Sequence, residues 1–356
     1  MARIRKTITD LPKMNFVEIF KADKVREDDL KFERFDEYVE DEDNELVGHA
    51  HKTFLRADSA ALSKFIKEIT TNPTTAYVTC FDEVKTEMIP KKISVLKKFV
   101  DVNDRHFSLS IPSREASASK ILNFMGAPTS YNFVIERSSK VTGEKEKLRP
   151  HLASVDFISP GEKFYSFEDF DIKWDHNIKK MIDNITKLFM SIQNEPTNNK
   201  KAVNVSDEQK QKYIDKAIED FVLSYLIRTL LLWDGDFHMG NIGFLYNEET
   251  KEIKIVNFDL EFSMQSSTAP IYYSYSVNYI RKKYPQVYNK FIEKVHILEK
   301  NMTKEQIEKT YFTNDSVMMT QLYYNAKDIM FKHRLYEGKK KIFNFLRRKK
   351  SNETTM

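Results

Sequence analysis

The sequence has little cysteine, little glycine and no long hydrophobic run, and each shortage excludes a class of protein. Its single cysteine, Cys80, has no second cysteine in the chain with which to form a disulfide, so we expect a protein of a reducing compartment. The longest apolar stretch, residues 221–233, contains Arg228 and is too short to span a bilayer. No N-terminal apolar segment resembles a signal peptide, and we therefore expect a cytoplasmic protein.

The composition is that of a folded protein. The chain has 356 residues, of which 41% are hydrophobic and 31% are charged, enough for two lobes and an accessory region. A net charge of +4 is too small to predict a nucleic-acid partner. The charge is uneven, because residues 37–45 are acidic and residues 332–350 are dense in lysine and arginine.

Two short segments that carry carboxylates give the clearest indication of chemistry. Residues 234–241 are D-G-D-F-H-M-G-N, and residues 257–261 are N-F-D-L-E. Phosphoryl transfer needs a carboxylate that orients the attacking hydroxyl, an amide oxygen on one magnesium ion, and a second carboxylate that links magnesium to the nucleotide phosphates. Asp236, Asn241 and Asp259 supply these groups in that order. Ordinary turn or cap roles for the same side chains are the alternative.

The spacing Asp-x-x-x-x-Asn resembles the catalytic loop of protein kinases, and the later aspartate stands where kinases carry D-F-G. The D-x-H-x-x-N pattern is also similar to the loop of HipA-like kinases, and the wider segment to that of aminoglycoside and choline phosphotransferases. The resemblance covers roughly residues 75–264 and implies a protein-kinase-like fold that uses ATP with Mg²⁺ or Mn²⁺. The site residues that it implies are Asp236 and His238 for catalysis, and Asn241, Asp259 and Glu261 for the metal.

Local patterns agree with an α+β, bilobal fold of this kind. One predicted helix, residues 113–125, has Ser113 as its N-cap and Gly126 as its stop. Two more helices are predicted over residues 174–193 and 206–233, the second with a capping box. The predicted strands cover residues 76–81, 93–100, 106–111, 131–135 and 153–158.

The domains follow from these elements. We predict an N-terminal extension over residues 1–70 whose structure the sequence does not define, and a β-rich small lobe over residues 71–160. A helical large lobe with the catalytic loop and the metal-binding aspartate covers residues 161–268. An added helical region with a basic tail covers residues 269–356.

The resemblance also implies a strand lysine, held by a helix glutamate, at the nucleotide phosphates. Glu115 shares a predicted helical face with Ala118 and Leu122, which directs its carboxylate toward the packed side. A buried carboxylate needs a partner, and the preceding predicted strand offers Lys97 and Lys98. Strand alternation turns only one of them inward; we predict Lys98, with Lys97 as the alternative. A first-turn position favoured by the helix dipole is the other explanation of Glu115.

Residues 153–161 match the kinase hinge in position, where the backbone of Asp156, Phe157 and Ile158 would bind adenine. An ordinary edge strand explains this segment equally well. Two features depart from protein kinases. The 8 glycines form no G-x-G-x-x-G loop, and Glu261 replaces the D-F-G glycine, as in small-molecule phosphotransferases.

Residues 339–350 interleave four apolar side chains with seven cations. Such a segment can lie on an anionic membrane containing phosphoinositides, or bind a polyphosphate such as an inositol phosphate; a solvated terminal helix is the alternative. The cations expected to bind such a ligand are Lys339, Lys340, Lys341, Arg347, Arg348, Lys349 and Lys350.

Three functions fit these motifs. The first is a Ser/Thr protein kinase able to phosphorylate itself, favoured by a resemblance to secreted bacterial effector kinases of the Legionella type; that resemblance implies a protein substrate and a place at a host membrane. The second is a phosphoinositide or small-molecule kinase, or a kinase-fold AMP transferase. The third is a nucleotide-binding pseudokinase scaffold, against which the intact Asp236, Asn241 and Asp259 argue.

Overall fold

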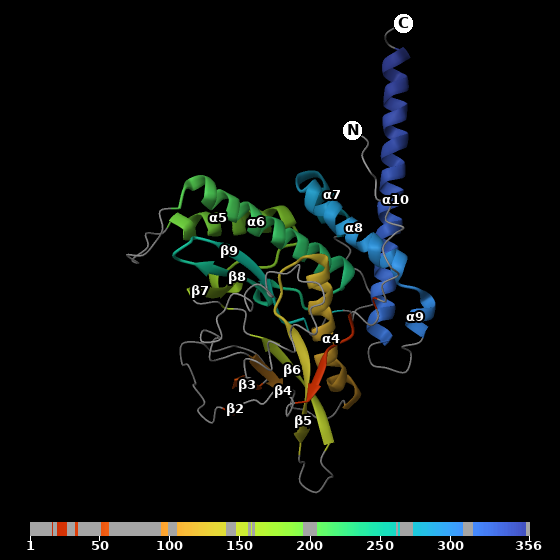
Figure 1. Cartoon of the computed structure of the whole chain (residues 1–356). Coiled ribbons are helices and arrows are strands. Elements are labelled where there is room, and N and C mark those ends of the chain that lie inside the picture. The colour runs from red at the N-terminus through yellow and green to blue at the C-terminus, as the bar shows by residue number, and fades with distance from the viewer. Residues whose placement is uncertain are drawn as a thin grey trace, which may run out of the picture.

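The structure, a computed structural model, describes residues 16, 20–26, 33–34, 51–56, 94–98, 105–139, 147–155, 158, 161–194, 205–260, 263, 273–308 and 316–353. These residues form an α+β fold with two sheets and several helices (Figure 1). The predicted strand at residues 76–81 lies outside the described residues.

The larger sheet orders six strands, among the described residues, as β1-β5-β6-β4-β3-β2. Strand β1 is parallel to β5, and the other pairs are antiparallel. The predicted strands at residues 93–100 and 131–135 are confirmed as β4 and β5, and the one at residues 153–158 overlaps only the last three residues of β6. The sheet also extends across the predicted boundary at residue 70. The strands are β1 (Lys24–Arg26), β2 (Glu33–Arg34), β3 (His51–Arg56), β4 (Ser94–Lys98), β5 (Asn132–Ser139) and β6 (Lys147–Val155).

Helix α4 (Arg105–Met125) packs against β5 and β6. It stops at Gly126, as predicted, where φ is +84° and a side chain would be strained. The predicted strand at residues 106–111 is wrong, because these residues form the first turns of α4, which continues through Pro112. Alternation of apolar residues over six positions predicts a strand only weakly. Once a helix is nucleated, each added residue contributes one more hydrogen bond, and this favours extension of the helix over residues 106–111.

The smaller sheet is an antiparallel sheet of β7 (Glu162–Ser166), β8 (Ile242–Asn247) and β9 (Ile253–Asn257). It lies beside α5 (Ile178–Asn194) and α6 (Asp207–Leu226), which confirm two predicted helices. The Ser206 hydroxyl accepts from the Gln209 amide at 3.2 Å, so the predicted cap is confirmed. The core here is aromatic, and burial of each ring contributes about 1.5–3 kcal/mol; its rings are Phe167, Phe189, Phe221 and Phe244.

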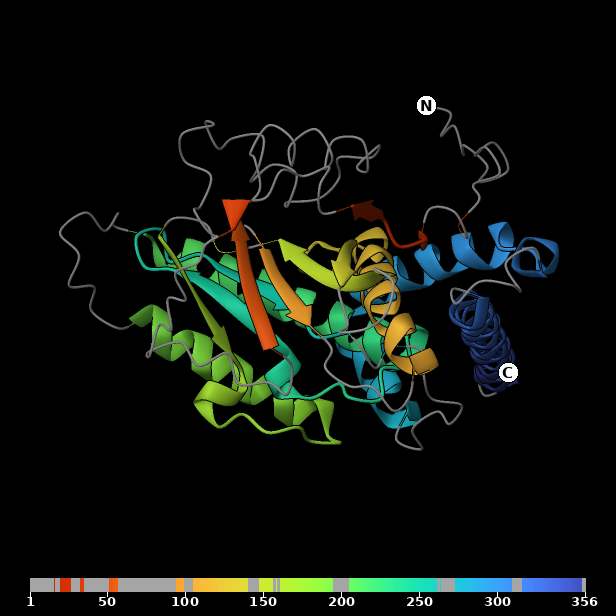
Figure 2. The same cartoon turned by 90° about the horizontal axis from the view of Figure 1, so that it is seen from below.

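The C-terminal region is helical, as predicted. The first part of α10 packs on α8, and its last part extends beyond the rest of the described chain (Figure 1). Figure 2 shows α10 almost end-on. A search of the helices in the described part of the chain found none with the length and hydropathy needed to cross a bilayer. The helices are α7 (Tyr273–Lys283), α8 (Pro285–Asn301), α9 (Lys304–Glu308) and α10 (Ser316–Glu353).

Candidate active site

Helix α6 enters the candidate site through one π-helical turn, η4 (Ile227–Leu231). The predicted α-helix to residue 233 therefore ends early. Trp233 follows with φ +46°, a left-handed conformation that reverses the chain. The Asp234 amide then donates to the Arg228 carbonyl at 2.9 Å, so the loop begins directly on the end of the helix. π turns are frequent at functional sites.

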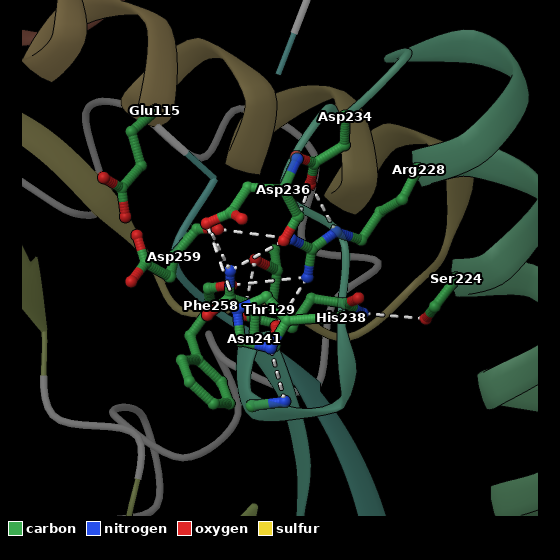
Figure 3. Close-up of polar contacts among 12 residues, drawn as sticks. Glu115, Thr129, Ser224, Arg228, Asp234, Asp236, His238, Asn241, Phe258 and Asp259 are labelled. Atoms are coloured by element: carbon green, nitrogen blue, oxygen red, sulfur yellow. Dashed lines mark hydrogen bonds and ion pairs between the residues drawn. The ribbon is translucent and has the colours of Figure 1, made fainter. Parts of the chain in front are cut away.

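The guanidinium of Arg228 joins the segments of the site (Figure 3). Its Nε donates to Asp234 Oδ2 at 2.7 Å, and its Nη2 lies 2.5 Å from the same oxygen. Nη1 donates to the carbonyl oxygens of Asn241 at 2.5 Å and Phe258 at 3.3 Å, and Nη2 to that of Asp259 at 3.2 Å. The guanidinium and the Asp234 carboxylate are fully buried, so each neutralises a charge that would be costly alone.

Asn241 is held against Asp236. Its Nδ2 donates to the Asp236 carbonyl at 2.9 Å and to Asp236 Oδ2 at 3.3 Å. With the amide nitrogen engaged in this way, the amide oxygen is directed away from those acceptors. Asn241 is buried, whereas the Asp236 side chain is about half exposed. The Asp236 carboxylate is therefore accessible to solvent, while the buried Asn241 fixes its position in the loop.

His238 caps the short helix η5 (Met239–Asn241), because its Nδ1 accepts from the Gly240 amide at 3.0 Å. Its Nε2 lies 3.9 Å from Asp236 Oδ2. A neutral imidazole that accepts at Nδ1 carries its proton on Nε2, and the ring therefore presents a donor on the side of Asp236.

Gly240 lies close to two polar side chains of the site. A Cβ at this position would lie 2.4 Å from Glu168 Oε2 and 2.7 Å from His238 Cε1. Glu168, at the start of η3 (Glu168–Phe170), is a third carboxylate at the loop. The sequence analysis missed it, because nothing in the sequence links residue 168 to a loop about seventy positions later.

Asp259 follows β9 in a left-handed conformation with φ +53°. Such a backbone costs a residue other than glycine on the order of 1 kcal/mol, although Asp tolerates it better than most. The Arg228 contact to its carbonyl and a 3.4 Å bond from the Phe258 amide to the Asn241 carbonyl hold this segment beside the loop. In Figure 3 the carboxylates of Asp259 and Glu115 point toward one another.

Asn257 ties the start of this segment to the connection between α4 and β5. Its Nδ2 donates to the Pro128 carbonyl and to the Ser224 hydroxyl, both at 2.7 Å. Its carbonyl accepts from the Ser130 amide and the Thr129 hydroxyl, both at 3.1 Å. The helix that carries Glu115 and the segment that carries Asp259 are thus joined by hydrogen bonds.

Glu115 lies on the buried face of α4, as predicted, with Ala118 and Leu122. Only 2% of Glu115 is exposed, and its Oε1 accepts from Asn132 Nδ2 at 3.5 Å. Its position is in the third turn of α4 rather than the first, so the helix dipole does not account for the carboxylate.

The register of β4 separates the two candidate lysines. Lys97 pairs with Leu152, which is buried in a cluster with Ala116 of α4. Residues paired directly across antiparallel strands share a face of the sheet, and neighbours along a strand alternate. Lys97 therefore occupies a position on the face that α4 covers, and Lys98 one on the opposite face. The side chains of both lysines lie outside the described part of the structure.

The remaining predicted residues belong to the hinge, to the metal site and to the basic tail. Strand β6 ends at Val155, Ile158 is exposed, and Asp156, Phe157 and Glu261 lie outside the described residues. On α10, the exposed Lys339, Lys340 and Lys341 lie on the part of the helix that extends away from the site (Figure 1). The described side chains do not include those of Arg347, Arg348, Lys349 and Lys350.

The oxygen atoms of the site fit a hard divalent cation. Within the described residues, no group of three or more His, Cys, Asp or Glu side chains converges. Asn241 and Asp259 nevertheless supply one amide oxygen and one carboxylate. Mg²⁺ is commonly bound by one or two carboxylates, substrate phosphates and water, so this set is sufficient when nucleotide supplies the remaining ligands.

No protein-family model matches the chain, and no curated protein matches it. Among solved structures, the chain is similar to the Helicobacter pylori proinflammatory kinase CtkA, with 15% sequence identity and a TM-score of 0.36. The match covers 68% of this chain and 87% of that one. A similarity of this size does not establish a shared fold, and the functional conclusion rests on the geometry of the site.

Proposed function

We propose that the chain is an ATP-dependent phosphotransferase with a bilobal protein-kinase-like fold, and that it phosphorylates Ser or Thr residues of proteins, including its own. The proposal rests on one observation: the buried Arg228 side chain binds three segments of the site, at Asp234, Asn241 and Asp259. Asn241 is bonded to Asp236 within one loop, and Arg228 holds the backbone of Asp259 beside it. In this proposal the larger sheet with α4 is the small lobe, and β7 to β9 with α5 and α6 belong to the large lobe.

Each side chain has a role in this proposal. Asp236, half exposed, orients the acceptor hydroxyl and takes its proton. Asn241 and Asp259 hold a divalent cation, which would neutralise charge on the phosphates of ATP. His238 holds the loop through Nδ1, which accepts from the Gly240 amide. Glu261 as a further metal ligand stays a prediction.

We assign the nucleotide lysine to Lys97 in place of Lys98. The support is the register, which puts Lys97 on the α4 face of the sheet together with Asn132, the residue bonded to Glu115. Glu115 would hold this lysine toward the phosphates, as the helix glutamate does in protein kinases.

The proposal is tested by incubating the purified chain with ATP labelled at the γ or the α phosphate, with Mg²⁺ or Mn²⁺. We expect the γ label alone to enter protein, with Ser or Thr as the modified residue by mass spectrometry. The matched control is Asp236→Asn, which keeps the size of the side chain and removes its charge. Transfer of the α label would identify an AMP transferase. Labelling of an added lipid or sugar would show that the acceptor is that molecule and not a protein.

A result without nucleotide binding or turnover, for a chain shown to be folded, would refute the assignment. Secretion into a host cell and a phosphoinositide or inositol phosphate ligand at residues 339–350 stay predictions from the sequence. Neither is needed for the chemistry proposed at Asp236.

A further inference from the structure

Helix α10 has two apolar faces, and among the described residues only one of them packs against other elements. The packed face contacts α8 and η4. Its side chains are buried; among them are Met319, Leu322, Ala326, Ile329 and Met330. This face accounts for the attachment of α10 to the rest of the chain.

The second face, here called the outer stripe, consists of Tyr324, Phe331, Leu335 and Ile342. Their exposures are 56%, 59%, 49% and 63%. The spacings of seven, four and seven residues place all four within a sector of about 40° on an α-helix, and the stripe runs about 27 Å along the axis. On the same helical projection, the packed face lies on the opposite side. An exposed apolar patch of this length is typical of an interaction site.

The charge beside the outer stripe is positive. Residues 327–341 contain six Lys or Arg side chains against two carboxylates. Both carboxylates lie beside cations along the helix, and Asp328 pairs with Lys332 at 2.6 Å. Lys339 and Lys341 are exposed on the two flanks of the end of the stripe, whereas the exposed Lys340 lies on the opposite side of the helix.

We propose that the outer stripe docks α10 lengthwise on a membrane surface that contains anionic lipid. The stripe would enter the boundary between headgroups and acyl chains, and the flanking lysines would meet the headgroup phosphates. Nucleic acid offers the phosphates but no apolar surface for Leu335 and Ile342. A second copy of α10 offers the apolar surface, but it brings the same excess of positive charge in either orientation.

The arrangement of the molecule permits this contact. The packed face and the outer stripe lie on opposite sides of α10, so the rest of the described chain stays on the water side of a docked helix. The last part of α10 extends beyond the other elements (Figure 1). The proposal concerns placement of the protein and does not depend on the phosphotransferase assignment.

The test is cosedimentation of the full chain with phosphatidylcholine vesicles, with and without phosphatidylserine. We expect binding only with phosphatidylserine, and a decrease with added salt, because salt screens exposed charges. Phe331→Gln/Leu335→Gln/Ile342→Gln removes three exposed apolar side chains without touching the packed face, and should weaken binding by about tenfold or more. Met190→Gln, at an exposed methionine of α5 that is 43% exposed, is the matched control and should bind normally.

Removal of the charges gives a second measurement. Lys339→Gln/Lys341→Gln should weaken binding by about fivefold for each lysine, whereas Lys340→Gln, on the opposite side of the helix, should change binding little. Equal binding to both vesicles, or unchanged binding after the stripe substitutions, would overturn the proposal. Light scattering distinguishes the remaining case: a dimer that the stripe substitutions dissociate would make the stripe a contact between copies and also overturn it.

Discussion

The guanidinium of Arg228 and the carboxylate of Asp234 form an ion pair in which neither side chain is exposed to solvent. The same guanidinium binds the carbonyl oxygens of Asn241 and Asp259, and Asp234 Oδ1 accepts from the Asp236 amide at 3.2 Å. The positions of the base and the metal ligands therefore depend on one buried pair.

Substitution of Arg228 by Met should destabilise the protein by about 3–5 kcal/mol, because it leaves the Asp234 carboxylate buried without its partner. Urea unfolding measures the loss. Arg228→Met/Asp234→Leu removes both charges and should regain much of the stability without regaining phosphate transfer, because the carbonyl contacts stay lost. Wild-type stability of the single variant would contradict the role given to this pair.

Asp259→Asn and Asp236→Asn should affect different steps. Asp259→Asn should weaken Mg²⁺-dependent ATP binding, measured by calorimetry, because it removes a charged metal ligand. Asp236→Asn should bind Mg²⁺ and ATP normally and lose transfer by at least about a hundredfold. The metal assignment is wrong if Asp259→Asn binds Mg²⁺ and ATP as the wild type does.

Gly240 and Gly235 form a matched pair within the same loop. Gly240→Ala places a Cβ 2.4 Å from Glu168 Oε2, whereas a Cβ at Gly235 meets nothing within 4 Å. We expect Gly240→Ala to displace the side chains of Glu168 and His238, which lowers the transfer rate at a small cost in stability. Gly235→Ala should change both little. Equal effects in thermal unfolding and transfer assays would show that the close approach at Gly240 does not matter.

Protonation of His333 should destabilise the fold. Burial lowers the pKa of His333 below its usual 6.5; Glu337 opposes this shift, and the nearby Arg281 and Arg334 add to it. The unfolded chain then binds the proton more tightly than the folded one, so this contribution to stability is full above pH 6.5 and is lost as the pH falls through the folded pKa. Urea unfolding from about pH 8 to about pH 5 should show a step that His333→Phe removes.

Lys97→Met and Lys98→Met test the register of β4. Lys97→Met should weaken ATP binding and transfer, because the position lies on the α4 face, while Lys98→Met should leave both near the wild type. Combination with Glu115→Gln should be non-additive for Lys97 alone, as expected for two side chains in contact. The reverse result would place Lys98 on the inner face and show that the strand pairs one residue out of register.

Local chemistry was predictable from the sequence. The caps at Ser206 and Gly126 depend on residues a few positions away, so their effect appears in any fold that contains the helix. Asp236 and Asn241 are five positions apart, and one loop is enough to bring them together. The buried direction of Glu115 followed from helical periodicity, which is also local.

The tertiary structure decided what joins these pieces. In the sequence, Arg228 only interrupts an apolar run, and its role depends on carbonyls that later segments bring to it. Glu168 reaches the loop only when β7 pairs with β8, and Lys97 differs from Lys98 only through the pairing of β4 with β6, since one step along a strand changes the face. The outer stripe of α10 exists because other elements cover one side of that helix and leave the other exposed. Such relations depend on contacts between residues distant in sequence, and local patterns do not encode them.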